Sequence, residues 1–227
     1  MKLRRIAKIV GGIVEPHVDG ALLHNEVAMV EALRSYGEVL RPWASRVVTS
    51  MLKDVIRRNT DAWEARTAVI GSELRSMLTE TNVGRVAQAL HDRQVTLITS
   101  LPVDAGARAQ ALAREAMLNS TRASETAQAL ARTEQVTASR ATLIARTETA
   151  KANAAVTQAR AEAVGVTHYF WRTMGDADVR ESHAELDGEV FAFDDPPEVG
   201  DEGAHGPGEV YNCRCYAEPI IGPVDEG

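Results

Sequence analysis

Aromatic residues, cysteines and long apolar runs are all scarce in this 227-residue sequence. Aromatic residues make up 4% of it, and none lies between Trp63 and Tyr169. The sequence has two cysteines, Cys213 and Cys215. They do not form a disulfide framework, because residues two apart lie at the outer limit of disulfide geometry. We therefore expect reduced thiols. No apolar run approaches the roughly 18 residues of a membrane-spanning helix, so we expect neither a membrane span nor a signal peptide.

Basic residues are scarce at one end of the chain. Residues 171–227 contain 3 Lys or Arg and 15 Asp or Glu, whereas residues 1–60 contain 10 and 6. The basic N-terminal segment could lie against nucleic acid or an acidic protein surface, while the acidic end would repel phosphate. Two solvated faces of opposite sign explain the same pattern, and both interpretations stay open.

Most of the chain has a helical pattern. Residues 1–20 combine glycines and a proline with short apolar pairs, which predicts an irregular N-terminal arm. Residues 21–104 show apolar side chains at helical spacing and predict a helical region. Within it, Pro42 predicts a kink or a new helix start, because proline lacks the N–H that a helix interior uses. Helix starts are expected at Thr60 and at Thr81 or Asn82, and a helix end at Leu101 and Pro102.

The composition changes towards the C-terminus. Residues 105–165 are rich in alanine, which predicts helices that pack through small side chains and end at Gly165. Alternating apolar residues then predict short strands at 189–193 and 210–216. We therefore expect an α+β fold, with a long, mostly helical N-terminal region followed by a small α+β module at residues 166–219. Residues 220–227 are expected to form a tail.

Several motifs in this region together resemble a known family. They are Ile144 to Glu148, Asn153, Trp171 to Thr173, Asp178 with Arg180, Ser182 with His183, Leu186 to Gly188, Pro207 with Gly208, and Asn212 to Cys215. In order and spacing they resemble the phage Mu F-like (MuF) head morphogenesis family of minor head proteins. The resemblance covers roughly residues 110–219 and defines a domain at 105–219. Its motif residues are Arg146, Thr147, Glu148, Asn153, Trp171, Asp178, Arg180, Ser182, His183, Asp187, Gly188, Asn212, Cys213, Arg214 and Cys215.

This resemblance implies a structural and assembly protein rather than an enzyme. The implied role is that of a minor capsid protein in the virion of a tailed phage or prophage, acting in head morphogenesis, DNA packaging or ejection. The implied partners are the portal protein, the major capsid or scaffold protein and packaged DNA, with no membrane. The implied location is the head interior or the portal vicinity, after assembly in the host cytoplasm.

The C-terminal motifs also contain metal-ligand residue types. His183, His205, Cys213 and Cys215 carry the side chains that bind tetrahedral zinc. A Cys-x-Cys pair is a weaker signal than Cys-x-x-Cys, and the sequence has no second cysteine pair. The alternative is that no cofactor binds and that the thiols pack in a small core of strands, with His183 hydrogen-bonded to a nearby carboxylate. Both hypotheses stay open.

Two other functions compete with the assembly role. A nuclease could use His183 as general acid and base, with Arg180, Arg214 and Arg172 stabilising phosphate charge. Against it, the acidic surroundings would repel a polyanionic substrate, and no second acid or base is evident. A weaker alternative is DNA binding through the basic N-terminal region, with an affinity that falls steeply with salt. Because the acidic surroundings disfavour the nuclease hypothesis, we expect no catalytic residues.

Overall fold

The computed structural model describes residues 2–19, 22–67, 83–119 and 123–221. The expected helix start at Thr81 or Asn82 lies outside these residues. The chain forms two compact units, one from residues 1–47 and 93–144 and the other from residues 48–92 and 145–227. None of the helices in the described ranges is both long and apolar enough to cross a membrane.

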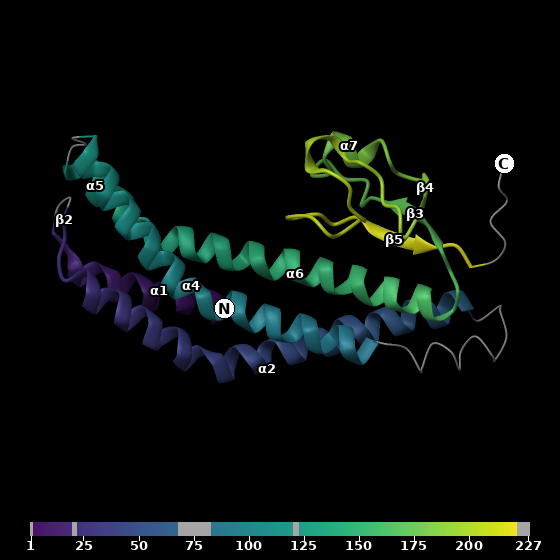
Figure 1. Ribbon diagram of the computed structural model, residues 1–227, viewed down its shortest axis with the longest axis horizontal. Coiled ribbons are helices and arrows are strands. Elements are labelled where there is room, and N and C mark those ends of the chain that lie inside the picture. The colour runs from purple at the N-terminus through teal and green to yellow at the C-terminus, as the bar shows by residue number, and fades with distance from the viewer. Residues whose placement is uncertain (1, 20–21, 68–82, 120–122, 222–227) are drawn as a thin grey trace. The chain divides into compact units, whose positions relative to one another are not determined.

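Figure 1 shows the helices and strands in chain order. The helices are α1 (Lys2–Val14), α2 (Glu26–Thr67), α4 (Val83–Leu118), α5 (Ala123–Ala131), α6 (Thr133–Ala163) and α7 (Glu181–Ala184), with short 3-10 helices η1 (Glu15–His17) and η2 (Gly200–Glu202). The strands are β1 (Val18–Asp19), β2 (Leu22–Leu23), β3 (His168–Arg172), β4 (Val190–Ala192) and β5 (Tyr216–Pro219). The predicted α+β class, a mostly helical region followed by a small module with short strands, is confirmed.

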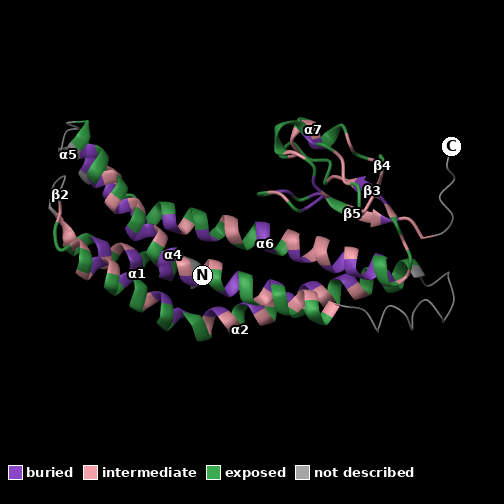
Figure 2. Cartoon of the chain, in the orientation of Figure 1, coloured by how far each residue is buried: buried purple, intermediate pink, exposed green. Residues whose placement is uncertain are grey.

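The first unit is built around the amphipathic helix α1. Its buried residues Ile6, Val10 and Val14 recur every four residues and share one apolar core with Met29 of α2 and with residues of α4. Buried residues are purple in Figure 2. The expected irregular arm over residues 1–20 is therefore wrong for most of its length. Burial of the apolar stripe outweighs the cost of about 1 kcal/mol that each glycine adds to a helix interior.

Two prolines lie inside long helices. Pro42 lies within α2 and Pro102 within α4, so α2 does not restart at Pro42 and the helix end expected at Leu101 and Pro102 is wrong. A proline in a helix interior costs roughly 3 kcal/mol. Leu40 near Pro42 is buried, as are Leu101 and Ala105 around Pro102, and this packing keeps both helices continuous.

Thr60 also lies inside α2 instead of capping a new helix. Its Oγ1 donates a 2.8 Å hydrogen bond to the carbonyl four residues earlier, the pattern of a threonine within a helix. The same oxygen accepts a 2.6 Å hydrogen bond from Arg160 of α6. The neighbouring Asn59 donates to Asn153 and Thr157 of α6 at 3.1 and 2.8 Å. Polar contacts thus join α2 and α6 within the second unit.

A three-stranded antiparallel sheet follows α6 in the second unit, with β3 between β4 and β5. Gly165 lies just after α6 with a left-handed φ of 72°, which confirms the predicted helix end. Tyr169 and Trp171 of β3 are buried. Tyr169 pairs with Phe191 of β4, and Trp171 pairs with Ala217 of β5. The central strand therefore carries the main aromatic side chains of the module core.

The two strands predicted from the sequence have different outcomes. The strand predicted at 189–193 is confirmed as β4. The strand predicted at 210–216 is wrong for most of its length, because β5 begins only at Tyr216. Asn212 has a φ of 57°, a left-handed conformation that a strand does not accommodate. Both cysteines consequently lie in the loop that leads to β5.

Candidate functional site

The C-terminal module buries His183, which lies on the short helix α7, and also His205 in the loop before β5. Arg180 precedes this helix in an extended conformation, and the turn that begins there directs the His183 side chain inward, where the residue is 1% exposed. Its ring meets Trp171 of β3 edge-on, with the ring centroids 5.5 Å apart. A buried imidazole needs partners for its nitrogens, and these partners define the candidate site.

Both ring nitrogens of His183 have polar neighbours. Nδ1 lies 3.5 Å from Sγ of Cys213 and 3.5 Å from Sγ of Cys215. Nε2 lies 2.8 Å from Oε2 of Glu202, the last residue of η2. A carboxylate only accepts hydrogen bonds, so Nε2 carries the proton. In the neutral ring, Nδ1 then presents its lone pair to the two sulfur atoms.

The two buried thiols act as a pair. Hydrogen bonds to the Cys213 sulfur, from the Cys215 thiol first and then from the backbone N–H groups of Cys215 and Gly208, lower the pKa of Cys213 to about 5. The backbone contact from Cys215 N to Cys213 Sγ is 3.4 Å long. The pKa of Cys215 is raised, because its thiol donates to Cys213 and is buried. Within the pair, Cys213 is therefore the thiol that loses its proton more readily.

Glu202 connects the buried cluster to its rim. The hydrogen bond from His183 lowers the pKa of Glu202, and the charge of Arg180, with Nε 3.4 Å from Oε1 of Glu202, acts in the same direction. Nε2 of His205 lies 3.4 Å from Oε2 of the same carboxylate. The His205 ring centroid is 5.6 Å from that of His183 and 5.9 Å from that of Trp171. Two histidines and one carboxylate thus share this side of the cluster.

The motifs that are distant in the sequence meet in this unit. The backbone N–H of Asn212 donates a 3.0 Å hydrogen bond to Oγ1 of Thr147 on α6. Arg180 donates a 2.7 Å hydrogen bond to the backbone carbonyl of Tyr211. The loop that carries the cysteines is therefore held from two directions, by α6 and by the residue that precedes α7.

The other motif residues have their own structural contacts. Gly188 adopts a φ of 90° just before β4, and Oδ1 of Asp187 accepts a 2.7 Å hydrogen bond from the N–H of Thr173. Arg214 forms two hydrogen bonds of 2.6 and 2.8 Å with Asp176. Thr147 and Glu148 are buried, Asn153, Arg180 and Ser182 are half-buried, and Arg146, Asp178 and Asp187 are exposed.

The structure brings the predicted metal ligands together, whereas the predicted nuclease residue Arg214 contacts a carboxylate instead. His183, Cys213 and Cys215 meet, and His205 lies beside them across Glu202. Arg214, expected to stabilise phosphate, is instead paired with Asp176. The sequence alone did not indicate which carboxylate contacts His183. The one signal for Glu202 was its position three residues before His205, and the same turn contains several other acidic residues.

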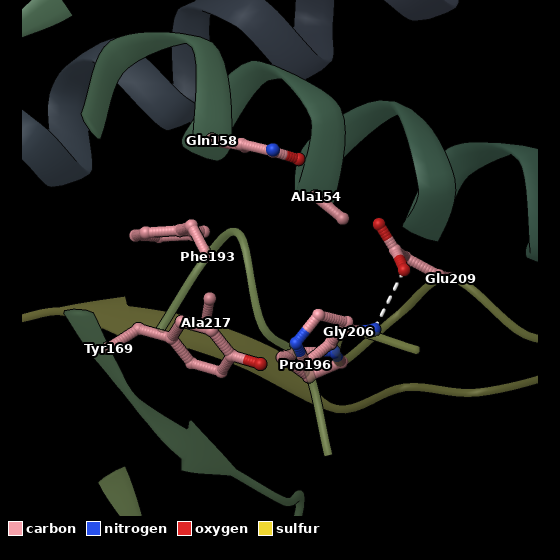
Figure 3. A pocket seen from close by; sticks show the side chains of 9 residues that line it. Ala154, Gln158, Tyr169, Phe193, Pro196, Gly206, Glu209 and Ala217 are labelled. Atoms are coloured by element: carbon pink, nitrogen blue, oxygen red, sulfur yellow. Dashed lines mark hydrogen bonds between the residues drawn. The ribbon is translucent and has the colours of Figure 1, made fainter. Parts of the chain in front are cut away.

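A small pocket also lies in the second unit (Figure 3). Ala154 and Gln158 of α6 form one wall, and Tyr169 lies on the opposite side. At its rim, the N–H of Gly206 donates a 2.7 Å hydrogen bond to Glu209. The pocket has a volume of about 180 Å³. Its lining includes neither His183 nor the two cysteines, so the pocket and the buried cluster are separate features.

Comparison with known proteins relates this module to a phage family. Residues 109–218 match the family model described as phage Mu protein F like protein. An uncharacterized protein of Haemophilus influenzae (strain Rd) is 36% identical over 140 residues, which are 62% of this chain and 30% of the relative. The aligned region thus spans less than a third of that relative's length. No solved structure matches the chain.

Proposed function

Because residues 109–218 belong to the phage Mu protein F-like family, we propose that this chain is a minor head protein of a tailed phage or prophage. It assembles in the host cytoplasm and occupies the head interior or the portal vicinity of the virion. Its partners are the portal protein and the major capsid or scaffold protein. It acts in head morphogenesis, at the stage of DNA packaging or ejection.

The extent of the family match carries this proposal. The match begins within α4, includes all of α6 and ends within β5. It therefore contains both partners of the contact between Thr147 and Asn212, which joins α6 to the loop before β5. A match that includes the helices as well as the C-terminal module supports a family role for the whole region.

Burial of His183 favours assembly over catalysis. A general acid or base must reach the proton that it transfers, whereas His183 is 1% exposed. Arg180 and Arg214 already contact Glu202 and Asp176 respectively. A phosphate ligand would have to displace these carboxylates in surroundings of strongly negative charge. We therefore propose a non-enzymatic role for this module.

Intrahelical ion pairs weaken the case for DNA binding through the basic N-terminal region. On α2, Arg41 pairs with Glu38 at 3.1 Å, and Arg57 pairs with Asp54 at 2.7 Å. Each pair offsets a positive charge that would otherwise face phosphate. Direct contact with packaged DNA is therefore the weakest part of the proposal. A steep fall of DNA affinity with increasing salt would support it, and a salt-independent response would argue against it.

Co-sedimentation tests the assembly role. The full chain is co-expressed with the portal and major capsid proteins of the same phage, and procapsids are separated on a sucrose gradient. We expect the chain to migrate with portal-containing procapsids and to stay at the top of the gradient when both partners are omitted. A chain that remains at the top in the presence of well-formed, portal-containing procapsids would overturn the proposal.

Nuclease activity needs a separate assay. The purified full chain and its His183→Ala variant are incubated with RNA and DNA, and the products are separated by gel electrophoresis. We expect no cleavage above the buffer control from either protein. Cleavage by the wild-type chain that is lost in the folded variant would establish the enzymatic alternative.

A further inference from the structure

We propose that His183, Cys213 and Cys215 form a zinc site, with Nδ1 of the histidine and the two Sγ atoms as ligands. The three residues are buried, and their ligand atoms all lie within 4.8 Å of one another. Imidazole nitrogen and thiolate sulfur are the donors that zinc prefers in proteins. The site would stabilise the fold of the module, and it is inferred from the ligand atoms and their distances, not from the proposed assembly role.

The distances match tetrahedral zinc. Zinc binds nitrogen at about 2.0–2.1 Å and sulfur at about 2.3 Å, so two such ligands at the tetrahedral angle lie about 3.6 Å apart. Nδ1 of His183 is 3.5 Å from each of the two sulfur atoms. A single S–H donor would satisfy the lone pair of Nδ1. Two sulfur atoms at the same distance from this nitrogen are therefore better explained by a shared metal ion.

Glu202 prepares the histidine for metal binding. Its carboxylate accepts a 2.8 Å hydrogen bond from Nε2 of His183, which fixes the proton on the nitrogen that faces away from the sulfurs. Histidine ligands of zinc commonly donate their second N–H to a carboxylate in this way, which orients the ring and raises its basicity. The lone pair of Nδ1 is thus directed at the proposed ion.

The surroundings of the sulfurs also suit a metal. The backbone N–H of Cys215 lies 3.4 Å from Sγ of Cys213, where it can stabilise thiolate charge. Trp171, fully buried, packs edge-on against the His183 ring and limits solvent access. Among the described residues the cluster supplies three protein ligands, so the fourth position belongs to a water molecule or to a side chain of a bound partner.

A zinc ion would explain how an irregular segment keeps its shape. His183 lies 30 residues from Cys213 and 32 from Cys215, and the segment between them contains only the short elements β4 and η2 beyond α7. The module core has five buried members, two of which are these cysteines. Small domains with little apolar core commonly need a metal or disulfides for stability, and a Cys-x-Cys disulfide is geometrically unfavourable.

Metal analysis of the full chain provides the first test. The protein is produced without a histidine tag in zinc-supplemented medium, dialysed and analysed by inductively coupled plasma mass spectrometry. We expect about one zinc per chain, and less than about a tenth of an equivalent would overturn the proposal. After replacement of zinc by Co²⁺, we expect the absorption bands of thiolate-to-cobalt charge transfer. Their absence from a cobalt-loaded chain would show that the cysteines are not ligands.

Substitutions distinguish this site from a neighbouring alternative. His183, Glu202 and His205 form a second group of ligand types, which uses Nε2 of His183 instead. In the proposed site, Cys213→Ser should abolish zinc binding, Glu202→Gln should weaken it about 10- to 100-fold, and His205→Ala should leave it unchanged. Zinc binding that survives Cys213→Ser and is lost in His205→Ala would overturn the assignment.

Thiol protection provides a measurement that needs no variant. Both thiols of the wild-type chain should resist alkylation, and addition of a strong chelator should make them reactive, with re-protection when zinc is restored. Cysteines that react at the same rate with and without the chelator would contradict the site. This result does not depend on whether a Cys213→Ser protein folds.

Discussion

The backbone N–H of Asn212 donates a 3.0 Å hydrogen bond to Oγ1 of Thr147, a residue 65 positions earlier on α6. The Thr147 side chain is buried, and Asn212 is held at a φ of 57°. Asparagine is one of the few residues that adopt this left-handed conformation readily. The contact therefore fixes the start of the Asn-Cys-Arg-Cys segment against the helix, and it places both cysteines relative to His183.

Thr147→Val should destabilise the second unit by about 1 kcal/mol. Valine keeps the shape of threonine but removes the hydroxyl, so the N–H of Asn212 loses its acceptor. Thr149→Val is the matched control, because Thr149 is exposed on the same helix and its hydroxyl bonds only to the Ala145 carbonyl. Urea unfolding followed by tryptophan fluorescence measures both effects. Equal midpoints for the two variants would show that the contact contributes no stability.

Gly208→Ala should be more destabilising than Gly165→Ala. Both glycines have positive φ, 87° and 72° respectively, so both substitutions introduce backbone strain of roughly 1–2 kcal/mol. At Gly208 the new Cβ would also lie 3.0 Å from the carbonyl oxygen of Cys215 and 3.5 Å from that of Ala150, whereas nothing lies within 4 Å at Gly165. Crowding of this kind adds about 1–3 kcal/mol.

Thermal unfolding of the two glycine variants checks this difference. The midpoint of Gly208→Ala should be several degrees below that of Gly165→Ala, because both substitutions place alanine at a positive φ and only the one at Gly208 adds crowding. Indistinguishable midpoints would mean that the loop before β5 does not approach α6 as closely as the Gly208 environment indicates.

The sequence predicted the elements whose determinants are local. The period of apolar residues predicted helices, alternation predicted β4, and Gly165 marked the end of α6 because glycine readily adopts a left-handed φ. His183, Cys213 and Cys215 could be grouped by their ligand chemistry alone. These predictions required no knowledge of which segments pack together.

The wrong predictions concern features that depend on tertiary packing. Helix α1 contains two adjacent glycines and is stabilised by a core shared with α2 and α4. Helix α4 continues through Pro102 because its neighbours are buried. The cysteine segment has strand-like alternation, but the left-handed Asn212 and its bond to Thr147 make it a loop. Glu202 could not be selected among many acidic residues, since its role depends on the folded position of His183.

Gly37→Ala should destabilise the first unit by about 1–3 kcal/mol. A Cβ at Gly37 of α2 would lie 2.7 Å from the backbone carbonyl oxygen of Thr99 on α4, a contact that only a backbone shift could relieve. Gly12→Ala in α1 is the matched control. It meets nothing within 4 Å, so it should be neutral or stabilising by up to about 1 kcal/mol. Circular dichroism at increasing urea concentration measures both, and an unchanged midpoint for Gly37→Ala would show that α2 and α4 are farther apart there.

Glu218 of β5 should contribute stability that is lost in acid. Its carboxylate accepts a hydrogen bond from Arg172 of β3 and lies 3.0 Å from Arg66 of α2, and these contacts lower its pKa, the hydrogen bond from Arg172 having the largest effect. Because the folded chain binds the Glu218 proton less readily than the unfolded chain, this stability is fully present above the unfolded pKa of about 4.3. It disappears as the pH falls through the lower pKa of the folded state.

Glu218→Gln isolates this contribution from the other carboxylates. At neutral pH the variant should be less stable than the wild type by up to about 1 kcal/mol, the range of a partly exposed ion pair. The difference should shrink as the pH falls below about 4.3, because protonated Glu218 resembles glutamine. Urea midpoints across this pH range provide the measurement, with the exposed Glu189→Gln as the control. A difference that stays constant down to the acid transition would show that the effect of the substitution arises from packing and not from the charge of Glu218.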